Sequence, residues 1–259
     1  NGNSFYNSIL RSIDNTILSQ NESSNKKYYD LIPGYTDNFK VYRIQNINTG
    51  KPVGKYGDNI TDYYPFSVWE LNDGLLAGLE SIGWEFATQV QKETIPIALT
   101  GRDVIGQART GSGKTAAFGL PTMNACQPTG ELQALILAPT RELANQVAEE
   151  LSNIQGDSGL NIQTVYGGTD LEKQARNLQA GVDIIVGTPG RVMDMTERGH
   201  IDLQKPTFFV LDEADRMLDM GFFPDIMWVV ERMTNREQTL LFSATFPQEI
   251  IDAANEFMN

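Results

Sequence analysis

Residues 103–115 read Asp103-Val104-Ile105-Gly106-Gln107-Ala108-Arg109-Thr110-Gly111-Ser112-Gly113-Lys114-Thr115. The first five of them predict a buried strand, and a helical pattern follows Lys114. Glycines between a strand and a helix let the backbone curl, so that successive N–H groups and the helix N-terminus face an anion. Lys114 adds a positive charge for the outer phosphates of a nucleotide, and the Thr115 hydroxyl can hold Mg²⁺. We therefore predict a phosphate loop over residues 108–115.

The phosphate loop departs from the general pattern at one position, because Ala108 stands where the first glycine is usual. The alternative interpretation is a glycine-rich strand-to-helix turn that binds nothing. Gly113-Lys114-Thr115 directly after a strand favours the phosphate-binding interpretation.

A second stretch places acidic residues at the end of another apolar strand, in Phe208-Phe209-Val210-Leu211-Asp212-Glu213-Ala214-Asp215. A buried strand would bring Asp212 beside the phosphate loop, within reach of the water shell of Mg²⁺. Glu213 could then orient and deprotonate an attacking water. A solvated acidic loop is the alternative. The phosphate loop about a hundred residues earlier favours the catalytic interpretation.

Short apolar strands alternate with helical periodicity from residue 66 onward. Strands are expected at 103–107, 134–138, 163–166, 183–187, 207–211 and 239–242, and helices at 141–154, 171–179 and 222–233. The pattern predicts an α/β fold, with a parallel β-sheet flanked by helices on both faces. Ligands on such sheets bind at the carboxyl ends of the strands.

With these residues in hand, residues 66–259 resemble the DEAD-box family of superfamily 2 RNA helicases, whose motifs occur in order. Residues 83–91 resemble the Q motif, 139–143 motif Ia, 167–168 the glycine doublet, 188–191 motif Ib, 212–215 the DEAD motif and 243–245 motif III. The resemblance implies the RecA-like fold of a P-loop NTPase. It also implies ATP or ADP with Mg²⁺ as cofactors, the metal being held by Thr115 and Asp212, mostly through water.

The resemblance assigns a role to each group of residues. The nucleotide is assigned to Phe66, Trp84, Gln91, Ala108, Thr110, Gly111, Ser112, Gly113, Lys114 and Thr115. The resemblance implies that Gln91 reads the adenine edge and that Phe66 stacks on the base. Catalysis is assigned to Lys114, Asp212 and Glu213, and the coupling of nucleotide state to closure of two lobes to Asp215, Ser243 and Thr245.

The resemblance also predicts an RNA face made of Pro139, Thr140, Arg141, Gly167, Gly168, Thr188, Pro189, Gly190 and Arg191. Arginines, hydroxyls and exposed backbone N–H groups suit contacts to the sugar-phosphate backbone, which are independent of base sequence. Arg141 and Arg191 could alternatively form ordinary surface ion pairs.

The family carries a second RecA-like lobe with an arginine-rich motif that completes the ATP site. This chain ends 14 residues after Thr245, so we expect that lobe to lie outside it. An arginine supplied to the transferring phosphoryl group is worth several orders of magnitude in rate. The expectation is an ATP-dependent RNA helicase lobe that binds nucleotide and RNA, with hydrolysis and unwinding requiring the other lobe.

Composition divides the chain near residue 65. Eight of the nine tyrosines lie before it, with seven Lys/Arg against six Asp/Glu, whereas the remainder has 13 against 27. We predict an N-terminal segment of unknown fold and role over residues 1–62, and the nucleotide-binding domain over 63–259. The net charge of −13 argues against a broad basic nucleic-acid surface, so any RNA face is a local patch. Such acidity is also typical of adaptation to a salty cytoplasm.

The single cysteine, Cys126, excludes an internal disulfide and fits a reducing cytoplasm. No apolar run is long enough for a membrane helix, and we expect a monomer. Two rival functions stay open. One is a nucleotide-gated clamp on RNA or protein without turnover, and the other is a different P-loop enzyme such as a small-molecule kinase. The matches at Gln91 and at residues 243–245 count against the kinase.

Overall fold

The computed structural model describes residues 42–44 and 64–258. Within them the strands are β1 (Tyr42–Ile44), β2 (Val104–Gln107), β3 (Ala134–Leu137), β4 (Ile162–Val165), β5 (Ile184–Gly187), β6 (Phe208–Asp212) and β7 (Gln238–Ser243). The longer helices are α3 (Asp73–Ser81), α4 (Gln89–Ala98), α5 (Lys114–Ala125), α6 (Arg141–Ile154), α7 (Leu171–Gln179), α8 (Pro189–Glu197), α9 (Ala214–Asp219), α10 (Phe223–Arg232) and α11 (Gln248–Phe257). Two short 3-10 helices complete the set, η2 (Phe66–Val68) and η3 (Gly156–Ser158).

The strands form one sheet in the order β1-β2-β7-β6-β3-β5-β4. Every neighbouring pair is parallel, so the carboxyl ends of all the strands lie at one edge. The phosphate loop follows β2 at that edge, and the acidic residues follow β6. All six strands expected after residue 66 are present, each within about one residue of its predicted bounds. The predicted α/β fold is confirmed.

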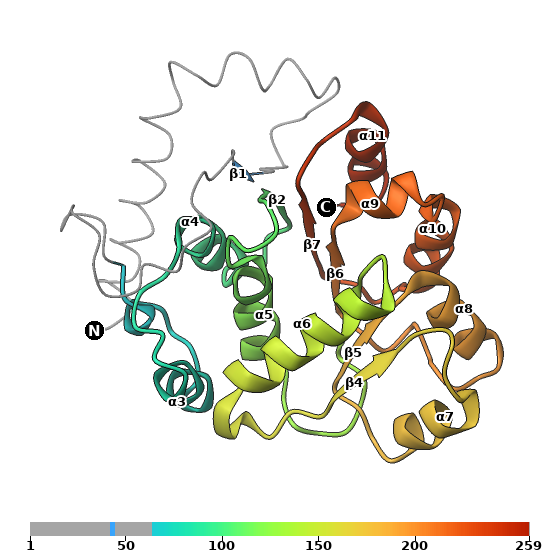
Figure 1. Ribbon diagram of the computed structural model, residues 1–259, viewed down its shortest axis with the longest axis horizontal. Coiled ribbons are helices and arrows are strands. Elements are labelled where there is room, and N and C mark those ends of the chain that lie inside the picture. The colour runs from blue at the N-terminus through green and yellow to red at the C-terminus, as the bar shows by residue number, and fades with distance from the viewer. Residues whose placement is uncertain (1–41, 45–63, 259) are drawn as a thin grey trace. The chain divides into compact units, whose positions relative to one another are not determined.

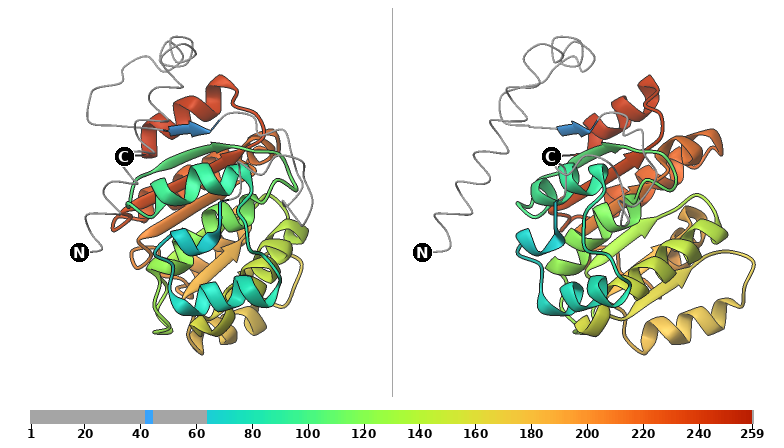
Figure 2. Two further views of the ribbon diagram at one scale, coloured as in Figure 1. Left: turned by 90° about the vertical axis from the view of Figure 1, so that its left-hand side faces the viewer. Right: turned by 60° about the vertical axis from the view of Figure 1, so that its left-hand side comes forward.

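Helices cover both faces of the sheet (Figures 1 and 2). Side chains of successive strand residues point to opposite faces. In β3, Ala134 and Ile136 accordingly pack in one buried cluster with residues of α3 to α6, and Leu135 and Leu137 in another with residues of α7 to α11. Strands β3 and β5 are buried along their whole length, which is why they are apolar throughout rather than alternating.

Helices α5 and α6 approach each other closely on the first face. A Cβ atom added to Gly119 of α5 would lie 2.2 Å from Cδ2 of Leu151 in α6. A side chain at residue 119 would therefore require Leu151 to shift.

The N-terminal boundary stays a prediction. Residues 1–41 and 45–63, which hold most of the N-terminal segment predicted over residues 1–62, lie outside the described residues. The sheet extends to the N-terminal side of the predicted boundary between residues 62 and 63, because β1 pairs with β2 through Tyr42 and Val104. Judged by contacts within the chain, the boundary between two compact units lies between Lys40 and Val41. Among the described residues, no helix combines the length and apolar character needed to cross a membrane.

Candidate functional site

The phosphate loop is a tight turn whose shape depends on glycine. Gly111 and Gly113 have φ of 80° and 90°, a left-handed conformation that side chains disfavour. Gly113 is also enclosed, because an added Cβ would lie 2.6 Å from Nε2 of Gln91. Inside the loop, the buried Ser112 hydroxyl has no hydrogen-bond partner among the described residues. A buried polar atom without a partner is costly, so this hydroxyl fits a loop that takes a polar ligand.

Lys114 forms the centre of a buried cluster of charges. Its Nζ donates to Oδ1 of Asp212 at 3.0 Å and lies 3.6 Å from Oε1 of Glu213. All three side chains are 6–7% exposed. Burial raises the pKa of the Asp212 carboxyl above its ordinary range, and the nearby Glu213 adds to this, although the Lys114 ammonium opposes it. One cation thus faces two carboxylates at the carboxyl ends of β2 and β6.

Glu213 has an unusual backbone conformation, and its carboxylate contacts two further polar side chains. It is the one non-glycine residue in the described part of the chain with positive φ, at 56°. Oε1 of Glu213 accepts a hydrogen bond from the Thr110 hydroxyl at 3.1 Å, and Oε2 pairs with Nη1 of Arg216 at 2.6 Å. Strained backbone persists where surrounding contacts over-determine it, and such positions cluster at functional sites.

The Q-motif residue Gln91 joins α4 to the phosphate loop. Oε1 of Gln91 accepts from the backbone N–H of Thr88 at 2.8 Å, and its Nε2 donates to the carbonyl of Gly113 at 3.1 Å. Gln91 is buried. The structure therefore brings two segments of the predicted nucleotide set together through one amide.

The aromatic members of the predicted nucleotide set belong to, or pack against, the buried cluster that contains residues of α3 to α6. Phe66 is 3% exposed and its ring meets that of Trp69 edge-on at 5.7 Å. Trp84 is half-buried against the same cluster, and Ala108 is buried at the end of β2. The stacking of an adenine on Phe66 stays a prediction.

The three predicted coupling residues form one network at the ends of β6 and β7. Oδ2 of Asp215 accepts from both the backbone N–H and the hydroxyl of Thr245 at 2.8 Å. The Ser243 hydroxyl accepts from the backbone N–H of Asp215 at 3.1 Å and donates to the carbonyl of Thr245 at 2.7 Å. Partial burial would raise the pKa of Asp215, but hydrogen bonds from Thr245, Ser243 and the Arg216 N–H outweigh it and hold that pKa below its usual value.

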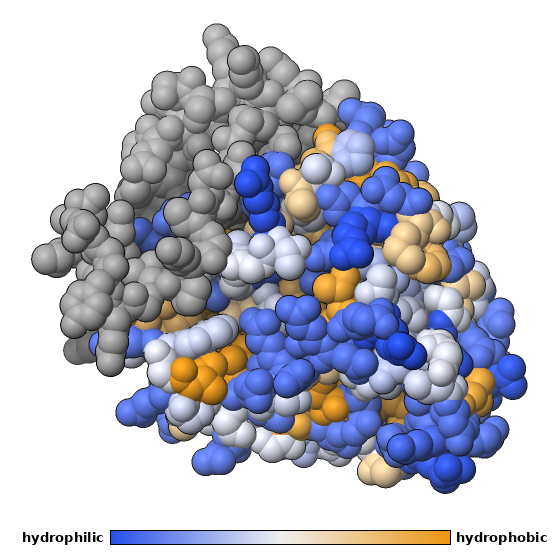
Figure 3. Space-filling view, in the orientation of Figure 1, coloured by the Kyte–Doolittle hydropathy of each residue, from blue (hydrophilic) through white to orange (hydrophobic). Residues whose placement is uncertain are grey.

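The predicted RNA face lies over the ends of β3, β4 and β5, in the other half of the sheet. Gly168 adjoins Arg141, since an added Cβ would lie 3.8 Å from its Nη1. Gly167 and Gly190 face open space. In the orientation of Figure 1, the coloured surface seen in Figure 3 is mainly hydrophilic, with apolar residues in separate small patches.

The members of the predicted RNA face differ in what they expose. Arg141 is 50% exposed in its side chain and pairs with its neighbour Glu142, whereas Arg191 is only 13% exposed. Pro139 and Pro189 are buried, so they shape the face without exposing much surface.

Three residues at these sites carried no assignment from the sequence. Arg216 pairs with Glu213, and Gln174 hydrogen-bonds to Arg191. Glu150 of α6 adjoins the Mg²⁺ candidates. Burial raises its pKa, a hydrogen bond from Thr115 opposes this, and the charge of Asp212 adds to it. Arg216 directly follows the DEAD motif, which is a usable signal. The other two lie in helices, where nothing in the sequence distinguishes them from surface residues.

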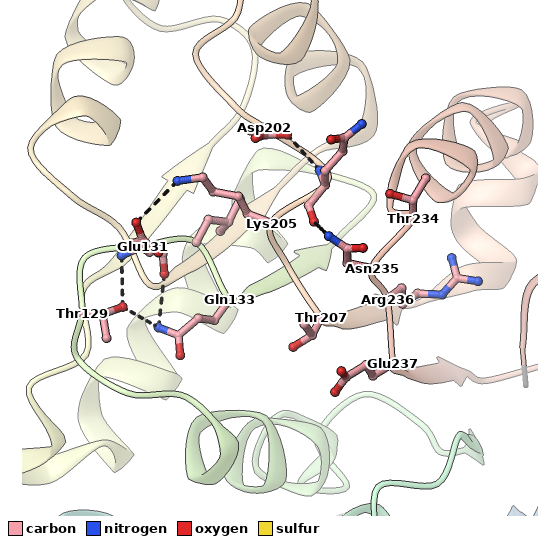
Figure 4. Close-up of a pocket in the computed structure, with 12 residues that line it drawn as sticks. Thr129, Glu131, Gln133, Asp202, Lys205, Thr207, Thr234, Asn235, Arg236 and Glu237 are labelled. Atoms are coloured by element: carbon pink, nitrogen blue, oxygen red, sulfur yellow. Dashed lines mark hydrogen bonds and ion pairs between the residues drawn. The ribbon is translucent and has the colours of Figure 1, made fainter.

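A separate hollow lies at the opposite, amino edge of the sheet, where the loops before β3, β6 and β7 meet (Figure 4). Its charged lining is mixed, and Lys205 lies 3.7 Å from Glu131. Gln133 turns to its own loop and donates to the Thr129 hydroxyl at 3.1 Å. No backbone loop comparable to residues 108–115 faces this hollow within the described residues, so it is a poorer candidate for a nucleotide.

The nucleotide site is suited to a metal only together with a ligand. Within the described residues, no group of three or more His, Cys, Asp or Glu side chains could hold a metal ion. Mg²⁺ needs six oxygen ligands and is commonly held by one or two protein groups plus phosphates and water. Thr115 and Asp212 therefore fit a metal that a nucleotide brings with it.

Comparisons with known proteins agree with one another. A family model described as DEAD/DEAH box helicase matches residues 88–253. The RNA helicase CrhR of Synechocystis sp. is 50% identical over 181 residues, which are 70% of this chain and 37% of that protein. The DEAD-box ATP-dependent RNA helicase CshA of Streptococcus pneumoniae serotype 4 is 48% identical over 194 residues, which are 74% of this chain and 37% of that protein.

Among solved structures, a DEAD box protein from the hyperthermophile Methanococcus jannaschii superposes with a TM-score of 0.73 at 40% identity. The superposition covers 76% of this chain and 54% of that one. The matched part of this chain spans little more than a third of the length of the curated relatives.

Proposed function

This chain belongs to the DEAD/DEAH box helicase family, and from that premise we propose that residues 63–259 form the nucleotide-binding lobe of an ATP-dependent RNA helicase. The observation that carries the proposal is the pairing of Lys114 with Asp212 and Glu213 in a buried loop-and-strand site. In phosphoryl transfer the protein contributes mainly positioning and charge stabilisation. A second RecA-like lobe would complete the site. We expect the protein to act as a monomer.

The chain's own residues have distinct tasks in this proposal. Lys114 would exchange its carboxylate partners for phosphate oxygens, and Thr115 and Asp212 would hold Mg²⁺ mostly through water. The metal, when bound, neutralises charge on the phosphates. Glu213 accepts the proton of the attacking water. The ion pair between Glu213 and Arg216 would have to open or rearrange before the carboxylate contacts that water.

Adenine selection is assigned to Gln91. An amide side chain has two N–H donors and two acceptor lone pairs, and the hydrogen bonds to Thr88 and Gly113 use one of each. One donor and one acceptor remain for the edge of a base, a combination that suits adenine. Since Gln91 also hydrogen-bonds to Gly113 of the phosphate loop, adenine bound to Gln91 would affect the loop directly.

RNA binding is assigned to the predicted RNA face. Arg141, the open glycines Gly167 and Gly190, and the hydroxyl of Thr188 offer contacts to phosphates and sugars. The charge of −13 keeps the affinity low, so we expect this lobe alone to bind single-stranded RNA only in about the 10⁻⁴–10⁻⁶ M range of non-specific binding. Base sequence should matter little.

Nucleotide titrations test the proposal. With Mg²⁺ present, the chain should bind fluorescent ADP and prefer it to the matching GDP. Equal affinity for both would contradict the roles of Gln91 and Phe66 while leaving the phosphate loop intact. Failure to bind either nucleotide would contradict the proposed function itself.

A further inference from the structure

Gln174 is a buried polar side chain at the centre of the predicted RNA face. It belongs to α7, whose other buried residues are Ala175 and Leu178, and it is only 9% exposed. An apolar residue would be the simple choice at an inward-facing helix position. A buried amide persists only when its donors and acceptor are hydrogen-bonded.

The partners of Gln174 come from two separate segments of the predicted RNA face. Its Nε2 donates to the carbonyl of Tyr166 at 3.1 Å and to the hydroxyl of Thr169 at 2.6 Å. Its Oε1 accepts from Nη1 of Arg191 at 3.1 Å. Tyr166 and Thr169 flank the Gly167-Gly168 pair on either side, so one amide spans the glycine doublet and motif Ib.

The chemistry of the partners fixes which way the amide points. A backbone carbonyl such as that of Tyr166 only accepts, and the Arg191 guanidinium only donates. The amide therefore has to place its nitrogen toward the loop and its oxygen toward the arginine. Glutamine meets both requirements, whereas glutamate would oppose a carboxylate to the Tyr166 carbonyl.

Arg191 is held from a second side by the same loop. Its Nη1 and Nη2 lie 3.5 Å and 3.4 Å from the carbonyl of Thr169. The side chain is 13% exposed, against 50% for Arg141. Arg141 pairs with its exposed sequence neighbour Glu142, whereas the Arg191 guanidinium is hydrogen-bonded to Gln174 and to the loop.

We propose that Gln174 is a positioning residue for RNA binding, which fixes Arg191 and the Gly167-Gly168 loop in one arrangement before RNA arrives. The proposal rests on the RNA-binding role given above. Ordering a long side chain at an interface costs affinity, and a prearranged side chain avoids that cost. Both ends of the Gln174 amide are already hydrogen-bonded to Tyr166, Thr169 and Arg191, so Gln174 acts through Arg191 and the loop.

Three variants of the full chain test this role. Gln174→Met keeps the length of the side chain and removes every hydrogen bond. Gln174→Glu keeps the acceptor for Arg191 and loses the donors to the loop. Gln179→Met makes the same chemical change at an exposed position of the same helix and serves as the control.

Affinity for fluorescent single-stranded RNA is measured by anisotropy at low salt, where backbone contacts are strongest. Gln174→Met should weaken binding by about three- to tenfold, since ordering one such side chain costs about 0.5–1.5 kcal/mol. The RNA affinity of Gln174→Glu should lie between that of Gln174→Met and that of the unaltered chain. Gln179→Met should bind RNA as tightly as the unaltered chain. Affinity for ADP with Mg²⁺ should stay unchanged in all three.

A double-mutant cycle separates positioning from a general loss of structure. If Gln174 acts through Arg191, Gln174→Met should weaken RNA binding much less in an Arg191→Ala background than in the original chain. Fully additive effects, or RNA binding by Gln174→Met equal to that of the unaltered chain, would overturn the proposal.

Failure of the underlying function has a different signature. If the unaltered chain binds no RNA, the proposed RNA role is wrong, and the guanidinium N–H signals of Arg191 in NMR spectra then decide the local claim. Those signals should exchange slowly with water in the unaltered chain and fast in Gln174→Met. Identical exchange in both would overturn the positioning role as well.

Discussion

The nucleotide site and the predicted RNA face share one edge of one sheet, yet they hold their charges in opposite ways. Lys114 and Asp212 are 7% and 6% exposed in their side chains, whereas the side chain of Arg141 on the RNA face is 50% exposed. A buried charge interacts strongly with its neighbours but requires a partner at all times. An exposed charge is screened by water and salt, and it contributes little when paired at the surface.

This difference suggests two kinds of recognition. The predicted nucleotide site contains charges that already oppose one another, so in our proposal a nucleotide exchanges partners with them. The predicted RNA face is built from open glycine loops and arginines, and its strength comes from contacts with many phosphates. Substitutions in the first region should therefore have large effects, and substitutions in the second should have small ones that depend on salt.

The largest effect is expected for Glu213→Gln. Removing the general base should lower ATP hydrolysis by about 10²–10⁴-fold in the protein that includes the second lobe. Affinity for ADP should change little, because the amide keeps the shape of the side chain. Glu231→Gln, at an exposed position of α10, is the control. Normal turnover by Glu213→Gln would mean that another group activates the water.

Lys114→Ala should produce the next largest effect, on binding. Loss of a charged hydrogen-bond donor costs about 1.5–3 kcal/mol, so affinity for ADP with Mg²⁺ should fall by roughly ten- to a hundredfold. Isothermal titration of the chain measures this, with the exposed Lys173→Ala as the control. Affinity equal to that of the unaltered chain would show that Lys114 does not contact the phosphates.

The same variant sharpens the comparison through its pH dependence. Without Lys114 the buried Asp212 has no cation beside it, and its pKa should rise further above the ordinary value of 3.8. A carboxyl with a raised folded-state pKa destabilises the fold progressively as pH rises from that value toward the folded pKa. Lys114→Ala should therefore lose most stability at neutral pH and less in acid, as denaturant unfolding would show. A loss that is equal at all pH values would contradict this account.

Smaller effects are expected on the predicted RNA face. Arg141→Ala and Arg191→Ala should each weaken RNA binding a few-fold for all sequences alike, and each should reduce the salt slope by about 0.7 per lost phosphate contact on a single strand. Arg191→Ala should also lower thermal stability, because Gln174 loses its hydrogen-bond donor. Arg141→Ala should leave stability unchanged. Tight, salt-insensitive binding to one RNA sequence would contradict the model of backbone contacts.

The smallest effect is expected from removing the N-terminal segment. Chains that begin at residue 41 and at residue 63 should both bind ADP as the full chain does, since every predicted nucleotide contact lies at or after Phe66. The first keeps β1 and the second loses it, so comparing their melting temperatures measures what β1 contributes to the sheet. Loss of ADP binding in the shorter chain would show that the domain begins earlier than residue 63.

The fold could be predicted from local sequence patterns, which also indicate where a nucleotide would bind. Runs of four to six apolar residues and the glycines of the phosphate loop are local signals, because strand burial and turn conformation depend on adjacent residues. Helices α6 and α7 begin and end at the predicted residues for the same reason. The order of the family's motifs then indicated which side chains meet.

The tertiary structure alone decided which polar groups are paired and which are exposed. The contact of Glu213 with Thr110, the contact of Gln174 with Arg191 and the difference in exposure between the two arginines depend on residues from separate elements of the fold. A glutamine on an amphipathic helix looks the same in sequence whether it faces water or a buried arginine. Hydrogen bonding and burial are properties of neighbours in space, and only packing the helices onto the sheet determines those neighbours.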